Sequence, residues 1–211
     1  MTGGIEMDIA SAFKGIPTGN ICDMNGREGS MDAAIKPLDY HFEMAGYAMT
    51  VTCVPGDNLT IHRAIAEAKP GVVLVIQCQG YLQAGVFGEL FATSCRARGI
   101  AGVVIDGACR DKRDIIEMNY PVFARGVCPN GTLKETCGTI DEVIECGGRI
   151  VHPGDIIVGD ADGVVVIPKE RAEEVLEKSQ GKKKKEDELK VLLQQGQTTA
   201  ELMGFAKKWQ S

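Results

Sequence analysis

Two short runs of continuous apolar residues most strongly constrain what this chain can fold into. Residues 72–76 read Val-Val-Leu-Val-Ile, residues 101–106 read Ala-Gly-Val-Val-Ile-Asp, and a helical stretch over 89–98 lies between them. Runs of this length without polar alternation are typical of strands buried on both faces of a parallel sheet. With a second helix predicted from Lys112 to Met118, the pattern predicts a β-α-β-α unit with a right-handed crossover.

Further elements are expected on both sides of this unit. A helix should begin near Pro17, with Thr18 or Asn20 as its N-cap. Residues 45–54 predict a strand, after which Asp57 or Asn58 should cap a helix that ends before Pro70-Gly71.

Glycine and proline positions predict the remaining connections. Residues 79–88 are expected to form a glycine-rich loop, and residues 148–168 a hairpin with Asp162-Gly163 as its turn. From Lys169 onward the chain is expected to be helical, with an apolar stripe interrupted at Gly181 and by the lysines at 182–185. We therefore expect an α/β domain over residues 1–168 and a helical tail over 169–211 that packs on the domain or on a neighbouring subunit.

Composition excludes several classes of protein. The formal net charge of −6 argues against a nucleic-acid partner, and no apolar stretch approaches the ~20 residues that span a bilayer. Without a Cys-x-x-Cys pair or a recognisable signal peptide, we expect a cytoplasmic protein whose thiols are all free. The eight cysteines are Cys22, Cys53, Cys78, Cys95, Cys109, Cys128, Cys137 and Cys146.

The two strand-to-helix turns of the β-α-β-α unit should meet at one edge of the sheet. The chain runs down the helix that starts at Glu89 and returns along the strand that ends near Asp106, so Arg110 and Asp111 should lie close to Gly88 and Glu89. Ligands of open parallel sheets bind beyond the carboxyl ends of the strands. Both turns are at that edge, so we predict the functional site there.

The residue types at these turns fit a site for an oxo acid and a hard cation. Gly88 lets backbone approach a ligand, and the N–H groups of Leu90 and Phe91, at a helix N-terminus, favour a carboxylate. Arg110 offers a planar donor fork for an oxo-acid oxygen, and Asp111 is an oxygen ligand for Mg²⁺ or Mn²⁺.

Two further carboxylates are predicted to assist. Glu89 is expected to take part in proton transfer, and Asp114, one helical turn after Asp111, to hold a water of the metal from a second shell. A purely structural interpretation of these residues stays open at this point. Glu89 can complement a helix dipole, Asp111 can serve as an N-cap, and Arg110 can be a surface arginine.

Beyond these arguments, the chain resembles the class II pyruvate aldolases, which include the 4-hydroxy-4-methyl-2-oxoglutarate and 4-carboxy-4-hydroxy-2-oxoadipate aldolases. The resemblance rests on Gly88-Glu89, twenty intervening residues and then Arg110-Asp111, and it covers roughly residues 15 to 180. The flanking stretches that also match are residues 55–58, 97–107, 121–126, 153–155 and 162–164.

The resemblance implies a fold, an assembly and an activity. The fold is a layered β/β/α sandwich of the swivelling-domain kind, and the assembly is a homotrimer or a hexamer. The activity is metal-dependent retro-aldol cleavage of 4-hydroxy-2-oxo di- or tricarboxylic acids, which releases pyruvate, with oxaloacetate decarboxylation at the same site. Arg110 and the metal at Asp111 would stabilise the enolate that both reactions share.

Two alternatives remain. The same fold family contains the regulator of ribonuclease activity A, so a non-catalytic protein that binds a partner is the first rival; the intact Arg110-Asp111 pair favours the enzyme. The second rival is an isomerase or hydratase of the same family that acts on a related acid.

Overall fold

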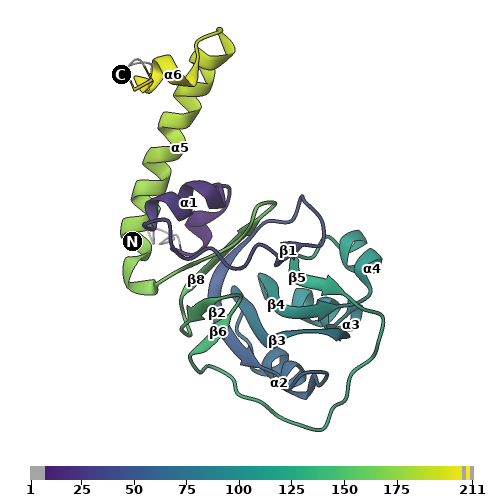
Figure 1. Cartoon of the computed structure of the whole chain (residues 1–211). Coiled ribbons are helices and arrows are strands. Elements are labelled where there is room, and N and C mark those ends of the chain that lie inside the picture. Colours follow the sequence, from purple (N-terminus) through teal and green to yellow (C-terminus); the bar gives the residue numbers. More distant parts are fainter. Residues whose placement is uncertain (1–7, 206–207, 210–211) are drawn as a thin grey trace, which may run out of the picture.

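The computed structural model describes residues 8–205 and 208–209, and its centre is a mixed β-sheet (Figure 1). The strands of the described residues are β1 (Lys36–Pro37), β2 (Met44–Thr52), β3 (Val72–Phe87), β4 (Gly102–Cys109), β5 (Val122–Val127), β6 (Ile144–Cys146), β7 (Arg149–Val151), β8 (Ile156–Asp160) and β9 (Gly163–Ile167). Seven of them form one sheet in the order β1-β5-β4-β3-β2-β8-β9. Strands β2 to β5 are parallel neighbours, whereas β1, β8 and β9 join antiparallel.

Helices cover this sheet and extend beyond it. They are η1 (Ser11–Phe13), α1 (Thr18–Met24), α2 (Leu59–Glu67), α3 (Glu89–Ala97), α4 (Lys112–Glu117), η2 (Lys169–Arg171), α5 (Ala172–Gln194) and α6 (Thr199–Leu202). Helix α2 packs on α3, α3 packs on α4, and the small β6–β7 sheet packs on β2 and β3. The expected α/β architecture, with its β-α-β-α unit and C-terminal helix, is confirmed. None of the helices in the described part of the chain is both long and apolar enough to cross a membrane.

Burial explains why the two apolar runs became central strands. Every residue of β4 is buried, and Val73 to Ile76 of β3 are fully inaccessible. Strands of a parallel sheet bury both faces, which removes the polar alternation of a half-exposed strand.

At the other side of the sheet, β8 and β9 alternate between two cores. Ile157 and Val166 pack into the main core, while Ile156 and Val165 face a second cluster that contains Phe13 and residues of α1 and α5. Successive side chains of a strand point to opposite faces, so this hairpin joins the N-terminal segment and the C-terminal helix to the sheet.

The predicted glycine-rich loop over 79–88 is wrong, because most of that segment belongs to β3. The strand continues to Phe87 and stays paired with β4, but its register shifts three times between Gln77 and Phe87. Gln79 and Gly80 have φ values of 55° and 69°. Left-handed residues bulge a strand without ending it, so the glycines mark an irregular strand.

Two local predictions are also corrected. Pro17 occupies the N-cap position of α1, so neither Thr18 nor Asn20 is the N-cap. The N–H and the hydroxyl of Thr18 instead donate to the Asp160 carboxylate, at 2.8 and 2.7 Å. The cap comes from a distant hairpin, which local sequence does not reveal. In that hairpin Asp160 pairs with Gly163, so the two-residue turn is 161–162, one residue earlier than expected.

Helix α5 is one continuous helix of 23 residues, although Gly181 and the lysines interrupt its apolar stripe. Its first half lies beside α1, where Val175 and Ser179 are buried and Lys182 pairs with Asp23 at 3.2 Å. Beyond this contact α5 projects away from the domain, and the short helix α6 follows it (Figure 1). Lys182 also pairs with Glu186 at 2.8 Å, one turn along the helix. Such i,i+4 pairs support an exposed helix.

A long connection between β5 and β6 crosses the carboxyl end of the sheet and is fixed at its middle by Asp57. The Asp57 carboxylate accepts the backbone N–H groups of Leu59, Glu135 and Thr136 at 2.8, 2.8 and 3.0 Å. Thr60 at the start of α2 accepts a fourth backbone N–H, that of Gly138, at 2.7 Å. We call residues 128–143 the strap. Asp57, expected as a simple helix cap, therefore also anchors a distant segment.

We expect Asp57→Asn to destabilise the protein at pH 7 by about 2 kcal/mol, the scale of one or two lost hydrogen bonds to a charged group. Burial alone would raise the pKa of the Asp57 carboxyl, but its backbone donors outweigh burial and hold that pKa below its usual range. A depressed folded-state pKa adds stability above the unfolded-state pKa of about 3.9, and this stability is lost as the pH falls through the folded-state value.

Urea unfolding at pH 7 and at stepwise lower pH measures this effect. The gap between wild type and Asp57→Asn should narrow as the pH falls below about 4. Asp162→Asn, at an exposed aspartate in the β8–β9 turn, is the control and should leave stability within about 0.5 kcal/mol. A gap that stays constant over the whole pH range would refute the anchoring role of the charge.

Candidate functional site

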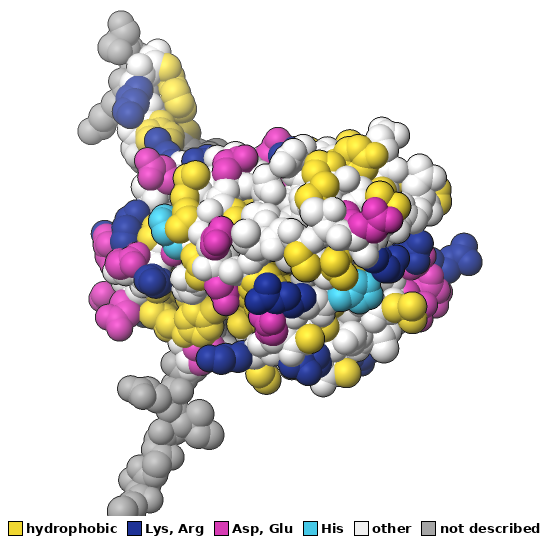
Figure 2. Space-filling model, turned by 90° about the horizontal axis from the view of Figure 1, so that it is seen from below, with side chains coloured by type: hydrophobic (Ala, Val, Ile, Leu, Met, Phe, Trp, Pro, Cys, Tyr) yellow, Lys and Arg dark blue, Asp and Glu magenta, His cyan; other side chains and the backbone are white. Residues whose placement is uncertain are grey.

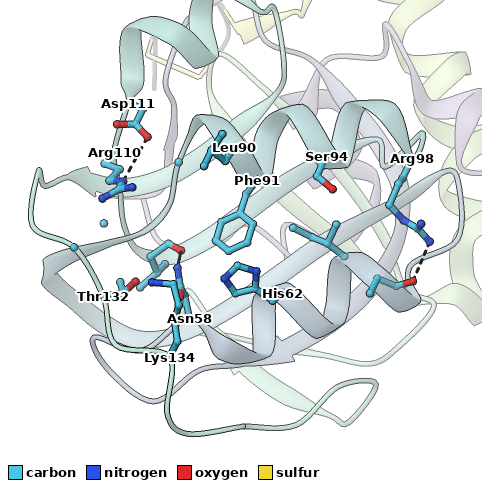
Figure 3. A pocket seen from close by; sticks show the side chains of 16 residues that line it. Asn58, His62, Leu90, Phe91, Ser94, Arg98, Arg110, Asp111, Thr132 and Lys134 are labelled. Atoms are coloured by element: carbon cyan, nitrogen blue, oxygen red, sulfur yellow. Dashed lines mark hydrogen bonds and ion pairs between the residues drawn. The ribbon is translucent and has the colours of Figure 1, made fainter.

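A cavity of about 560 Å³ lies between α2, α3 and the strap, at the carboxyl end of the parallel strands (Figure 3). Arg110 and Asp111 stand at one end of it, and Arg98 stands at the other. The rings of His62 and Phe91 meet between the two ends, with 4.6 Å between their centroids. The cavity is large enough for a small organic acid.

Both predicted turns lie side by side at the first end of the cavity. The backbone N–H of Arg110 donates to the carbonyl of Phe87 at 2.8 Å, which continues the β3–β4 pairing into the turn. Asp111 Oδ2 accepts the backbone N–H of Glu89 at 3.1 Å and lies 3.4 Å from Arg110 Nε. The carboxylate of one turn therefore ties together the starts of α3 and α4.

Gly88 is the residue that permits this approach. A Cβ added there would lie 2.4 Å from Asp111 Oδ2 and 3.2 Å from Arg110 Nε. Gly85 is similarly enclosed, because its added Cβ would lie 2.8 Å from the Arg110 Cβ. A side chain at either position would displace the arginine–aspartate pair, so both glycines are required by space and not by backbone conformation.

Asp111 itself has a left-handed backbone, with φ 55° and ψ 38°. It occupies the N-cap position of α4, but its side chain makes no capping hydrogen bond to that helix. The interpretation of Asp111 as an ordinary helix cap is therefore wrong, because its carboxylate turns back to the start of α3. Its left-handed conformation is unfavourable for most residues and is tolerated by aspartate and asparagine.

Leu90 and Phe91 lie in the first turn of α3, where backbone N–H groups have no acceptor within the helix. Both residues line the cavity. The side chain of Phe91 packs against His62 and Phe87, whereas Leu90 is 79% exposed. The helix start thus presents donors to the cavity beside Arg110.

Glu89 and Asp114 are placed less directly. Both side chains are exposed, and neither is among the residues that line the cavity. Glu89 contacts the site through its backbone N–H, and Asp114 lies in the first turn of α4. Their predicted roles in proton transfer and in holding a metal-linked water stay predictions.

Several cavity residues were not identified from the sequence as site residues. His62 on α2 faces the cavity, and Thr132 and Lys134 reach it from the strap (Figure 3). Asn58 Nδ2 donates to the carbonyl of Val86 at 3.0 Å, while its buried Oδ1 has no hydrogen-bond partner among the described residues. An acceptor buried without a partner is costly, and Asn58 is among the residues that line the cavity. In the sequence, only the polar Asp57-Asn58 pair before a helix hinted at a place for Asn58 in the site.

A hard divalent cation fits the donor set around Asp111. One carboxylate oxygen contacts Glu89 and Arg110, which leaves Oδ1 without a recorded partner in the described structure. Within residues 8–205 and 208–209, no cluster of three or more His, Cys, Asp or Glu side chains is positioned to hold a metal. Mg²⁺ typically binds through one or two carboxylates, with substrate oxygens and waters completing its shell. The site suits such a cation better than it suits zinc.

No cysteine is among the residues that line the cavity. All eight cysteines are free in the structure. Cys109 precedes Arg110 but is fully buried, and burial raises its pKa to about 12. A thiol in that state is not a nucleophile at neutral pH, which leaves the oxygen and guanidinium groups to carry the chemistry.

Charge on the surface is mixed. Figure 2 shows one face of the molecule, on which basic and acidic side chains lie in small groups among hydrophobic ones. The lining of the cavity is more basic than that face. Arg98, Arg110 and Lys134 line it together with a single carboxylate, that of Asp111. The cavity therefore suits an anionic ligand.

Comparison with known proteins identifies the family. The family model Aldolase/RraA, of the RraA-like proteins, matches residues 18–166, and the chain belongs to this family. A Halalkalibacterium halodurans protein with the provisional name 4-hydroxy-4-methyl-2-oxoglutarate aldolase is 42% identical over 183 residues, which is 87% of each chain. An uncharacterized Methanocaldococcus jannaschii protein is 35% identical over 96% of this chain and 95% of its own.

Solved structures share the fold. An uncharacterized Pseudomonas syringae protein superposes with a TM-score of 0.82 at 25% identity, over 90% of this chain and 94% of its own. The RNA-processing inhibitor RraA from Thermus thermophilis superposes with a TM-score of 0.67 at 27% identity, over 72% of this chain and 93% of its own. The family thus joins proteins named as aldolases with proteins named as inhibitors of RNA processing.

We expect Gly88→Ala to weaken divalent-cation binding with little loss of stability. The added methyl group meets the end of a flexible side chain, so Asp111 can move aside, but only by leaving its place beside Glu89 and Arg110. Titration of Mn²⁺ by electron paramagnetic resonance measures the affinity, and thermal unfolding measures the stability.

The control is Gly181→Ala in α5, where an added Cβ meets nothing within 4 Å. It should leave Mn²⁺ affinity unchanged. Asp111→Asn should abolish Mn²⁺ binding, and asparagine keeps the left-handed backbone that alanine would strain. Wild-type Mn²⁺ affinity in Gly88→Ala would show that the close approach is not needed for the metal.

Proposed function

We propose that this protein is a divalent-metal-dependent lyase that cleaves 4-hydroxy-2-oxo di- or tricarboxylic acids to release pyruvate and also decarboxylates oxaloacetate. The observation that carries the proposal is the contact between two turns, which puts Arg110, Asp111 and the N-terminus of α3 at one end of a cationic cavity. The family of the chain, which includes a relative provisionally named as such an aldolase, supports the same reaction.

The substrate would bind by its oxo-acid end. The N–H groups of Leu90 and Phe91 receive the carboxylate, since helix N-termini favour anions. Arg110 donates to the 2-oxo oxygen through its planar fork. Bound to Asp111, Mg²⁺ or Mn²⁺ would supply Lewis acidity toward the same end of the substrate.

Charge then develops on the 2-oxo oxygen when the C3–C4 bond breaks, or when CO₂ leaves oxaloacetate. Arg110 stabilises that charge in both reactions, because both pass through pyruvate enolate. Asn58 Oδ1, buried without a partner, can accept a hydrogen bond from a substrate hydroxyl.

Proton transfer is assigned to Glu89. Aldol cleavage requires loss of the C4 hydroxyl proton, and Glu89 is the carboxylate residue between Gly88 and Leu90, which both line the cavity. A water carries this proton from the substrate to Glu89, since the side chain itself does not line the cavity. The same water then returns a proton to C3 of the enolate, which yields pyruvate. Decarboxylation needs no such removal, so Glu89 matters less there.

The second candidate function is a protein-binding regulator with no catalysis, and the similarity to the RNA-processing inhibitor from Thermus thermophilis favours it. A regulator has no need for Arg110 beside a carboxylate that leaves one oxygen without a partner. We therefore rank the enzyme first. The two functions differ in whether any oxo acid is turned over.

The direct test is pyruvate release from a panel of 4-hydroxy-2-oxo acids and oxaloacetate, coupled to lactate dehydrogenase. We expect turnover with Mg²⁺ or Mn²⁺, its loss in EDTA, and its return when metal is restored. Full activity after exhaustive chelation would remove the metal from the proposal. No turnover of any panel member would favour the regulator.

A second test separates Arg110 from Glu89. Arg110→Lys should lower kcat for both reactions by about 10²–10³, the typical cost of one lost donor to a developing oxyanion, since lysine cannot copy the planar fork. Glu89→Gln should lower aldol cleavage more than decarboxylation, because only cleavage needs the hydroxyl proton removed.

Values of kcat/KM for both substrates, at saturating metal, decide this division. Arg113→Gln is the control, since Arg113 is exposed on α4 and does not line the cavity. If Arg110→Lys spares decarboxylation, or Glu89→Gln affects the two reactions equally, the assignment of roles is wrong even where the reaction is right.

A further inference from the structure

The cavity is longer than the proposed chemistry needs. From Gly88, which touches Arg110, to Arg98 the chain advances ten residues, or about 15 Å at about 1.5 Å per helical residue. The reacting part of an oxo acid occupies only the end near Arg110. Beyond it the cavity continues between α2 and α3 and is lined by His62, Ile65 and Ser94.

The middle of this extension is narrow and mainly apolar. The His62 and Phe91 rings meet edge to face, with centroids 4.6 Å apart, and the buried side chain of Ile65 lies along the wall. An alkyl chain can pass such a wall at no cost in desolvation of polar groups. Ser94 on α3 adds a single hydroxyl.

Arg98 closes the far end. Its Nη2 donates to the carbonyls of Ala66 and Ala68, at 3.0 and 3.3 Å, where α2 ends. These bonds hold the guanidinium in place, and Nε and Nη1 have no recorded acceptor in the described part of the chain. A fixed arginine with free N–H groups at the end of an apolar passage is suited to a carboxylate.

The length of the matching ligand follows from the spacing. An acid of four carbons has three bonds between its end carbons, which span about 4 Å at about 1.2 Å per bond. The advance of about 15 Å along α3 from Gly88 to Arg98 is much longer. A ligand that reaches both Arg110 and Arg98 is therefore longer than oxaloacetate.

We propose that Arg98 forms a second carboxylate subsite, so that the preferred ligands are 2-oxo diacids longer than oxaloacetate with an apolar segment between their two ends. This inference rests on the proposed function for the placement of the oxo-acid end at Arg110, and it names the class of substrate that the site prefers. His62 and Phe91 contact the middle of the chain, and Arg98 binds the distal carboxylate.

Calorimetric binding of two ligand series to the full chain with Mg²⁺ tests the proposal without relying on turnover. One series is the unbranched 2-oxo diacids of five to nine carbons, and the other is the 2-oxo monoacids of the same lengths. Affinity of the diacids should increase with length, and at the length that reaches Arg98 it should exceed that of the matched monoacid at least tenfold, the scale of one hydrogen bond to a charged group.

Arg98→Gln should remove this advantage of the long diacids while leaving the five-carbon diacid and the monoacids within about twofold of their wild-type affinities. Arg96→Gln is the matched control. Arg96 lies on the same helix and also donates to a backbone carbonyl, that of Met118 at 2.9 Å, but it does not line the cavity. Thermal unfolding of both variants shows whether each retains its fold.

The outcomes separate the two proposals. Short oxo acids that bind, with no gain from a distal carboxylate at any length, would overturn the second subsite and leave the proposed function intact. A diacid advantage that survives in Arg98→Gln would overturn the role of Arg98. Failure of every 2-oxo acid to bind would overturn the proposed function, and the second subsite with it.

Discussion

The site depends on one close approach, in which the carboxylate of Asp111 fits where Gly88 has no side chain. That contact joins the turn after β3 to the turn after β4, and it holds Arg110 against the start of α3. Parallel strands alone bring these turns to the same edge of the sheet, but they do not set the distance between them. The absence of a Cβ at Gly88 sets that distance. The N–H groups at the start of α3, the guanidinium of Arg110 and the carboxylate of Asp111 then surround one small volume.

Much of this arrangement could be predicted from the sequence. The apolar runs at 72–76 and 101–106 identify β3 and β4 because burial on both faces leaves a local signature, and the order of strand and helix then brings Arg110 near Glu89. The resemblance of the spaced Gly-Glu and Arg-Asp pairs pointed to the Aldolase/RraA family, which the family model confirms. These features are local, or follow from topology that local features determine.

The rest depends on contacts between distant segments. Asp160 satisfies the start of α1 from a hairpin 142 residues away, so no local pattern identifies it. The extension of β3 through its glycines was missed because pairing with β4 overrides the turn preference of Gly80. Lys134 reaches the cavity because Asp57 holds the strap across it, and Asn58 lines the cavity where its Nδ2 bonds to the carbonyl of Val86. Sequence reasoning found the residues with distinctive chemistry and missed those made relevant by placement.

The left-handed backbone of Asp111 restricts how this site can change over evolutionary time. A position of that geometry accepts few residue types besides glycine, asparagine and aspartate without strain. A lineage that abandoned the metal but kept the turn would therefore be expected to carry glycine or asparagine there, because a bulkier replacement would disturb the start of α4 as well. Under the proposed function, the residue at this one position would separate family members that bind a metal here from members that retain only the scaffold.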